Sequence, residues 1–487
     1  MKTNHLLIFA SLTIGLGGCA VGPNYHQPNV PAPAQWNALA GGETNAAAPV
    51  AAWWKNFHDA ELDSLIERAA GSNLDLRIAQ ARVREARAQY RLTAADLWPT
   101  VDASGSYARQ RQSQNQPVIH AFPPLPSSAF ENNVYQSGFD AAWEIDVFGG
   151  KRRATEAAGA QVAATQFGER EVLVTLCGEV ARNYVEARGY QRRLEIARDN
   201  IRAQEQSLAL TQDRFTNGLT SDLDVQQANT ILATTRASVP TLETALQAAI
   251  HRLGVLLGQT PEALRTELAA VAPIPAAPPV VPVGLPSDLL LRRPDVRLAE
   301  RRLAAATANI GVATADLFPK FFLTGAAGFE GVSGSDWFNS GSRFWSAGPT
   351  VQWNIFDAGR IRANIKVQTA RQEQALANYE NTALGAFEDV ENALTAYAKE
   401  QIRRQQLAAA VRSSEESLRL ANQLYANGLS NFLNVLDAER SLYQAQDALV
   451  QSDRTISANL IALYKALGGG WETPDRSPQL AQAKTVN

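Results

Sequence analysis

The chain has 487 residues and a formal net charge of −3, from 45 Lys and Arg against 48 Asp and Glu. This near-neutral balance argues against a nucleic-acid-binding protein, because such proteins favour basic patches. Beyond the first eighteen residues no apolar run of about 18 residues occurs, which excludes a transmembrane helix on length. A mature chain that spans a membrane must therefore do so with strands.

Residues 1–18 have the pattern of a secretory signal peptide. Lys2 precedes an apolar run, and Leu16-Gly17-Gly18 stands directly before Cys19. A lipoprotein peptidase needs small residues followed by cysteine, because the thiol is acylated before the peptide bond is cut. We therefore expect cleavage before Cys19 and a covalent lipid on it; an ordinary signal peptide with an incidental cysteine is the less favoured alternative. Ala20 follows, whereas an Asp there would indicate inner-membrane retention.

The remaining chemistry-bearing residues predict neither an enzyme nor a metal site. Cys177 is the only other cysteine, so the mature chain can form no intramolecular disulfide, and we expect Cys177 to be a core residue. The five histidines are scattered, and no nucleophile–base pair, P-loop or paired metal-ligand motif occurs. We expect no cofactor besides the lipid. Met1 is the only methionine and leaves with the signal peptide, so a thioether relay for copper or silver is not expected in this chain.

An internal repeat is the most informative feature of the sequence. Its matches lie at an offset of 220 early in each half and at an offset of 210 later. The paired segments are Ala95–Pro99 with Ala315–Pro319, Trp143 with Trp353, Asn217-Gly218-Leu219 with Asn427-Gly428-Leu429, and Leu257-Gly258 with Leu467-Gly468. The first half therefore carries about ten extra residues, which fall in the polar segment 113–133 and predict a loop.

Each half is predicted to hold a helix, two strands around a polar loop, a very long helix, a turn and a second long helix. We divide the chain into a signal peptide (1–18), a lipidated N-terminal segment (19–57), a first repeat (58–257), a proline-rich linker or equatorial region (258–287), a second repeat (288–468) and a disordered C-terminal tail (469–487).

The predicted strands alternate strictly between apolar and polar residues. Expected on the apolar face are Val101, Ala103, Tyr107, Phe139, Ala141, Trp143, Ile145, Val147, Phe321, Leu323, Phe329, Trp345, Val351, Trp353 and Ile355. The other face carries Asp140, Glu144 and Asp146, which are too charged for a soluble core and are expected to face a wet lumen. Such strands are typical of a membrane barrel, with a soluble half-exposed sheet as the alternative. Four strands cannot close a barrel, so the chain must oligomerise; two copies give eight strands, three give twelve, and the pattern does not choose.

The helices are predicted to be long and to pair. The segment 151–215 lacks proline and would span roughly 95 Å at 1.5 Å per residue. Apolar residues then recur every seven positions, which is typical of a coiled-coil seam. These residues are Val225, Leu232, Val239, Leu246 and Leu253 in the first half and Val435, Leu442, Leu449, Ile456 and Leu463 in the second. The Asn-Gly pairs between the helices tolerate a left-handed backbone, and Ser221 and Ser430 are expected to start the following helices.

Together these residues resemble the outer membrane factor family of TolC-like and OprM-like (NodT-type) efflux lipoproteins, over nearly the whole mature chain. The resemblance is carried by Cys19, Trp143-Glu144-Ile145-Asp146, Leu290–Val296, Phe356-Asp357-Ala358-Gly359-Arg360 and Asn427-Gly428-Leu429. It implies an α+β membrane protein. Four β-strands per protomer would form a shared 12-stranded trimeric outer-membrane β-barrel, continuous with a long α-helical coiled-coil periplasmic barrel.

The resemblance also implies a function and partners. The chain would be a passive exit duct for drugs or other small molecules, lipid-anchored in the bacterial outer membrane and extending into the periplasm. Its partners would be two further copies in a homotrimer, outer-membrane lipid, a periplasmic adaptor (membrane fusion) protein and an inner-membrane proton-driven transporter. Alternatives are the outer-membrane duct of a type I protein secretion system and a periplasmic coiled-coil adaptor or scaffold lipoprotein. The doubled hairpins with acidic inner faces count against the scaffold, and a periplasmic enzyme ranks last.

The same resemblance assigns roles at the helical tips. Asn217, Gly218, Leu219, Asn427, Gly428 and Leu429 would contact the adaptor. The tips would also close the periplasmic mouth, with Asp437 as the inner acidic residue of the gate. Asn434 stands one turn earlier where TolC has a second aspartate, which leaves one ring of carboxylates, and Asp224 is the acidic residue of the first tip. Arg440 could pair with Asp437 and hold the closed state. The alternative is that Asp437 only favours the positive start of a helix.

Overall fold

The structure, a computed structural model, describes residues 20–36, 42–43, 51–111, 113, 131–276, 281–282 and 286–471. The predicted signal peptide, Cys19, most of the predicted loop at 113–133 and all but three residues of the predicted tail lie outside the described residues.

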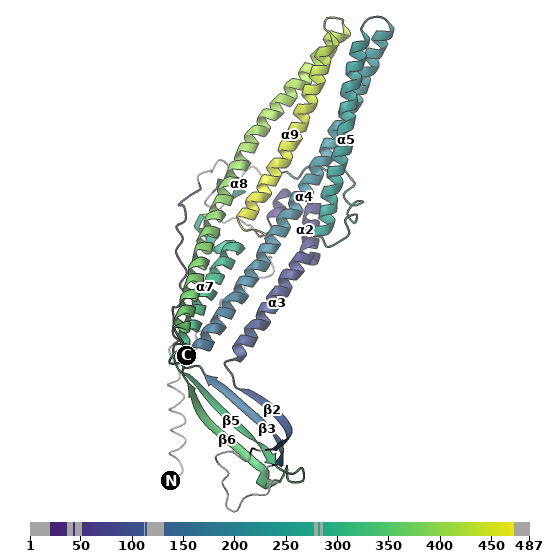
Figure 1. Ribbon diagram of the computed structural model, residues 1–487. Coiled ribbons are helices and arrows are strands. Elements are labelled where there is room, and N and C mark those ends of the chain that lie inside the picture. Colours follow the sequence, from purple (N-terminus) through teal and green to yellow (C-terminus); the bar gives the residue numbers. More distant parts are fainter. Residues whose placement is uncertain are drawn as a thin grey trace, which may run out of the picture. The chain divides into compact units, whose positions relative to one another are not determined.

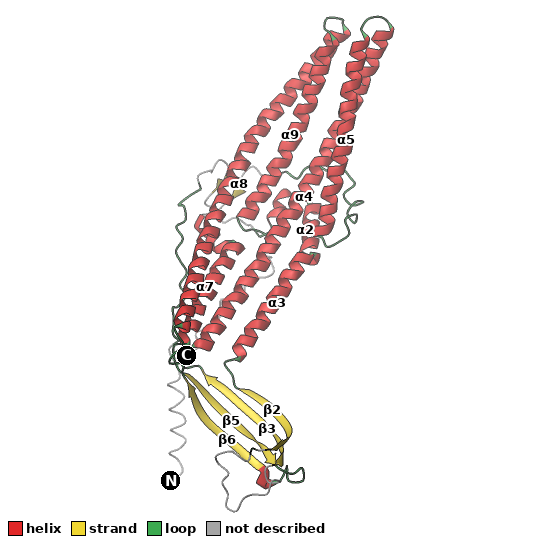
Figure 2. Cartoon of the chain, in the orientation of Figure 1, coloured by secondary structure: helices red, strands yellow, loops and turns green. Residues whose placement is uncertain are grey.

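The elements follow the same order in both halves of the chain (Figures 1 and 2). The first half contains α2 (Ala60–Ser72), α3 (Leu74–Ala95), β2 (Thr100–Arg111), β3 (Glu131–Ile145), α4 (Gly150–Thr216) and α5 (Asp222–Leu256). The second half contains α6 (Pro286–Arg292), α7 (Pro294–Ala315), β5 (Lys320–Gly331), β6 (Arg343–Gln352), α8 (Arg360–Ala426) and α9 (Phe432–Ala466). The short elements are β1 (Gly42–Glu43), η1 (Trp53–Phe57), β4 (Val281–Pro282) and η3 (Ser340–Ser342).

The long helices are as long as the sequence predicts. Helices α4 and α8 have 67 residues each, which corresponds to about 100 Å. Helix α5 continues through Pro240 without a break in its assigned span. None of the helices in the described part of the chain combines the length and the apolarity that a membrane crossing requires.

The chain folds into two compact units that do not coincide with the two sequence repeats. The first unit is formed by Met1–Pro28, Arg84–Ala164 and Glu300–Asn378 and contains the four-stranded sheet with the helical segments that adjoin it. The second unit is formed by Asn29–Val83, Thr165–Ala299 and Tyr379–Asn487 and contains the two long helical hairpins. Each repeat therefore contributes to both units, as α4 and α8 do with their two ends.

In the first unit, the sheet has the antiparallel order β2-β3-β5-β6. Its register pairs Ala103 with Phe139, Phe139 with Ala327, and Ala327 with Trp345. Side chains alternate across a strand, so these odd-numbered residues share one face throughout the sheet. That face is apolar and open, with Phe139 63 % and Trp345 80 % exposed in the single chain.

Two strands are shorter than the alternation predicts. Strand β3 ends at Ile145 and β6 at Gln352, so the predicted strand residues Val147, Trp353 and Ile355 lie beyond them. The indole N–H of Trp353 donates instead to the carbonyl oxygen of Leu317 at 3.0 Å. The alternation of apolar and polar residues continues past the end of each strand. It therefore does not indicate where the backbone hydrogen bonds of the strand stop.

In the second unit, residues 264–268 of the predicted linker pack into the core. Leu264 and Leu268 are fully buried, and the buried amide of Gln191 donates to the carbonyl oxygen of Leu268 at 2.6 Å. The buried side-chain amide of Gln191 is thus satisfied by the backbone of this segment. Cys177 is a buried core residue, as expected, and burial raises the pKa of its thiol to about 12, which keeps it unreactive.

Candidate functional site: the helical tips and the sheet

Helices α4 and α8 end in the same turn at the tips of the two hairpins (Figure 1). Gly218 and Gly428 both have a φ of +72°, which a residue without Cβ adopts at no steric cost. The N–H of the leucine after each glycine donates to the carbonyl five residues earlier, at 2.8 Å in the first tip and 2.9 Å in the second. This is the Schellman motif, and it places Asn217–Leu219 and Asn427–Leu429 at the tips.

The following helices start differently from one another. Ser221 is the N-cap of α5, as predicted, although its side chain makes no capping bond. The N-cap of α9 is Asn431, so the prediction of Ser430 is wrong by one residue. The physical reason is that the Asn431 side chain accepts a hydrogen bond from the backbone N–H of Asn434 at 3.4 Å. The Ser430 hydroxyl instead accepts from the side-chain Nδ2 of Asn434 at 2.7 Å.

Leucines project from both tips. Leu219 is 65 % and Leu429 75 % exposed, and Leu223 and Leu433, one turn into the following helices, are also exposed. Water-exposed apolar groups that gather at one place on a surface are typical of an interaction site.

The predicted gate residues form contacts within their own hairpins. Nη2 of Arg440 lies 2.7 Å from Oδ1 of Asp437, so the predicted i,i+3 ion pair is present, with both side chains more than half exposed. Asp224 accepts a hydrogen bond from the hydroxyl of Thr220. Exposed pairs of this kind contribute little to stability, so the Asp437 pair can break at small cost when the tip moves.

A buried carboxylate that the sequence analysis did not single out lies close to this ion pair. Glu439 of α9 is only 5 % exposed, and it accepts a hydrogen bond from the hydroxyl of Ser207 in α4. Burial raises the pKa of Glu439. Glu439 stands four residues after Val435 and three before Leu442, so it lies on the same helix face as the heptad seam. This spacing is the sequence signal that could have identified it.

An aromatic cluster ties the second tip together. Phe432 is 1 % exposed and packs on Tyr425, with ring centroids 5.2 Å apart. Val435 and Leu436 belong to the same buried cluster. The guanidinium of Arg214 in α4 lies 4.6 Å from the Tyr425 ring centroid, so the first hairpin contacts the second at this point.

The three carboxylates predicted to face a lumen have different surroundings. Asp140 lies directly opposite Asp102 in the register of β2 and β3. Like charges at such close range are tolerated only where water screens them, which agrees with a wet face. Glu144 forms an ion pair with Lys151 at 3.5 Å. Asp146 lies one residue beyond β3 and accepts from the backbone N–H of Arg152 at 2.8 Å, so it caps the start of α4 instead of projecting from the strand.

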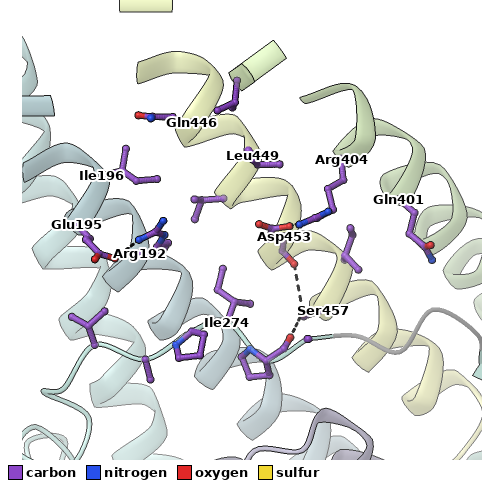
Figure 3. A pocket seen from close by; sticks show the side chains of 18 of the residues that line it. Arg192, Glu195, Ile196, Ile274, Gln401, Arg404, Gln446, Leu449, Asp453 and Ser457 are labelled. Atoms are coloured by element: carbon purple, nitrogen blue, oxygen red, sulfur yellow. Dashed lines mark hydrogen bonds and ion pairs between the residues drawn. The ribbon is translucent and has the colours of Figure 1, made fainter. Parts of the chain in front are cut away.

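A cavity of about 920 Å³ lies in the second unit, between α4, α8, α9 and the segment Val271–Ala276 (Figure 3). Two ion pairs line it, Arg192 with Glu195 and Arg404 with Asp453. Ser457 donates to the carbonyl oxygen of Pro275 at 2.8 Å and fixes the proline segment against α9. No group of three or more metal-binding side chains occurs in the part of the chain that the structure describes.

These features define a class of protein. A four-stranded sheet with one open apolar face and one polar face, combined with helices of about 100 Å, is suited to a membrane-inserted duct assembled from several chains.

Comparison with known proteins identifies the family. The model of the outer membrane efflux protein family matches residues 65–259 and 285–469. The cation efflux system protein CusC of Escherichia coli O6:H1 is 34% identical over 97% of this chain and 100% of its own length. The toluene efflux pump outer membrane protein TtgI of Pseudomonas putida is 35% identical over 97% of this chain and 99% of its own. The solved outer-membrane channel OprN superposes with a TM-score of 0.87 at 39% identity, covering 93% of this chain and all of that one.

The chain belongs to the outer membrane efflux protein family. It is an outer-membrane channel component of an efflux system, and the α+β fold class predicted from the sequence is confirmed.

Proposed function

We propose that three copies of this chain form a passive exit duct for small molecules across the outer membrane. The observation that carries the proposal is the open sheet. Its outer strands, β2 and β6, have no further partner among the described residues. Unpaired edges cannot remain in lipid, so the sheet must close with other copies, and three sheets give a closed barrel of twelve strands.

The helices support a periplasmic extension of this duct. We propose that the long helices extend the duct into the periplasm, where their tips present the exposed leucines Leu219 and Leu429. We propose that a periplasmic adaptor protein binds these tips. We further propose that an inner-membrane proton-driven transporter supplies the energy for export.

The cargo we propose is drug-like or solvent-like. The printed names of the relatives include both a toluene pump and a cation system. Residues 19–487 contain no methionine, so a thioether relay for soft cations has no ligands in this part of the chain. We also propose that Cys19 carries the lipid anchor, which lies outside the described residues.

The stoichiometry is tested by native mass spectrometry of the full chain in detergent. A mass of three acylated copies is expected, whereas one or two copies would exclude the twelve-stranded barrel. Cargo is tested in cells that lack their own outer-membrane efflux channels but retain pumps and adaptors for toluene and for copper. We expect the chain to restore tolerance to toluene with the first set, and restoration by neither set would contradict an efflux role.

A further inference from the structure

The first described residues of the chain are held in a groove of the first unit. The N–H of Val21 donates to the carbonyl oxygen of Phe148 at 3.1 Å, in the loop between β3 and α4. We call residues 20–25 the N-terminal strap. The groove that holds it, the strap groove, is formed by Gly149, Arg153 and Gly311.

Arg153 is the centre of the strap groove. It is only 5 % exposed, and its Nε donates to the carbonyl oxygen of Val21 at 3.2 Å. One terminal nitrogen donates to the side-chain oxygen of Asn24 at 2.6 Å, and the other to the carboxylate of Glu156 at 2.8 Å. A buried guanidinium is costly unless its N–H groups have partners, and two of these partners belong to the strap.

The two glycines of the groove leave room for the strap backbone. A Cβ on Gly149 would lie 2.7 Å from Cα of Ala20, and a Cβ on Gly311 would lie 3.0 Å from the carbonyl oxygen of Val21. Gly359 occupies the matching position of the second repeat, with a φ of +87° against +80° for Gly149, yet a Cβ there would meet nothing within 4 Å. The close approach is therefore specific to the first repeat.

The far end of the strap is held as well. The hydroxyl of Tyr25 donates to Oε1 of Glu300, a fully buried residue of α7, at 2.8 Å. With Val21 bound at one end and Tyr25 at the other, the strap has a single position relative to the junction between the sheet and the helices of its unit.

We propose that the strap groove is a mount that fixes the acylated N-terminus at the junction of sheet and helices, with Arg153 as the positioning residue. This inference rests on the proposed lipid anchor. Cys19 directly precedes Ala20 in the sequence, so an anchor on Cys19 is joined covalently to the strap. Acyl chains give membrane affinity but no position along the protein. The strap groove supplies that position. It places the sheet on the membrane side of the lipid headgroups and the adjoining helices of the first unit on the periplasmic side.

The test measures the strap and the anchor separately in full-length protein purified from outer membranes. Hydrogen exchange of the strap amides is followed in Arg153→Gln and Gly149→Ala. The matched controls are Arg152→Gln, whose side chain contacts Asp146 and the carbonyl of Val147 instead of the strap, and Gly359→Ala. Incorporation of labelled palmitate and the yield of assembled trimer are measured in the same preparations.

We expect the strap to exchange roughly tenfold faster in the two groove variants, with unchanged palmitate incorporation and a several-fold lower trimer yield. Both controls should behave as the wild type. The proposal would be overturned if the strap amides stayed protected from exchange in Arg153→Gln. It would also be overturned if they exchanged faster while the yield of assembled trimer stayed at the wild-type value. If the wild-type protein carries no palmitate, the proposed lipid anchor is wrong. Exchange protection of the strap amides shows separately whether the groove holds the strap.

Discussion

The two hairpin tips share one backbone and differ in the side chains that follow it. Both end a 67-residue helix with a glycine at the same positive φ and the same Schellman hydrogen bonds. At the 210-residue offset, the buried Phe432 stands where the first tip has Asp222, and Asp437 stands where it has Gln227. The buried Glu439 likewise replaces Asn229.

The two tips therefore place different side chains on the same backbone turn. The first tip is a hairpin end with a solvated acidic start, whereas the second is anchored by an aromatic cluster and carries an ion pair and a buried carboxylate. We infer that the gate of the proposed duct resides in the second tip, and that the first hairpin is the surface it closes against.

The largest expected effect comes from the anchor of the second tip. Phe432→Ala removes a fully buried ring and should lower the free energy of local opening of α9 by about 3–5 kcal/mol. Asp222→Ala, at the matching position, should change the opening of α5 by less than about 0.5 kcal/mol. Hydrogen exchange of the two helix starts measures both, and equal effects would remove the asymmetry between the tips.

The turn glycines should give equal effects at the two tips. Gly218→Ala and Gly428→Ala each force a Cβ into a left-handed backbone with open space around it, which should cost about 1–2 kcal/mol. Gly385→Ala in the middle of α8, also in open space, serves as the control and should stabilise its helix by up to about 1 kcal/mol. Exchange of the amides that flank each turn measures the cost, and a loss at one tip only would show that the two turns are not equivalent.

The buried carboxylate should make only the second tip sensitive to pH. Burial raises the pKa of Glu439 above its ordinary value. In the packed seam between α4 and α9, the Glu439 carboxyl therefore binds a proton more tightly than an exposed glutamate does. The seam is therefore most stable below the ordinary pKa and loses stability as the pH rises through the raised value. Glu439→Gln should abolish this dependence.

The measurement compares exchange protection of α9 at a pH of about 5 and of about 8, after correction for intrinsic exchange rates. Helix α5, which has the neutral Asn229 at the matching position, is the internal control. A pH slope in α9 that survives the substitution would show that another group titrates in the seam.

Much of the fold follows from the sequence for identifiable reasons. The face that each strand residue occupies follows from strict alternation, because a one-residue slip would turn Phe139 and Trp345 to the polar face. The bounds of α4 follow from a long segment without proline between two turn signals. The strand ends and the packing of the proline-rich segment do not follow, since backbone pairing and the partners of Leu268 depend on residues distant in the chain.

The site is less predictable than the fold. The ion pair of Asp437 with Arg440 is local, so its spacing reveals it. The bond between Ser207 and Glu439 joins positions 232 residues apart, and the strap groove joins residues 20–25 to α4 and α7. A single sequence gives the helix face on which Glu439 lies but not the helix that faces it.

The most direct test of a gate in the second tip is single-channel conductance of the full-length protein in a planar bilayer, with Asp437→Ala compared with Gln227→Ala at the matching position of the first tip. Asp437→Ala should raise the conductance because it removes the carboxylate that would form a ring in the proposed trimer, together with its ion pair to Arg440. Gln227→Ala should leave the wild-type value. An unchanged conductance in Asp437→Ala, or an equal rise in both variants, would contradict a gate confined to the second tip.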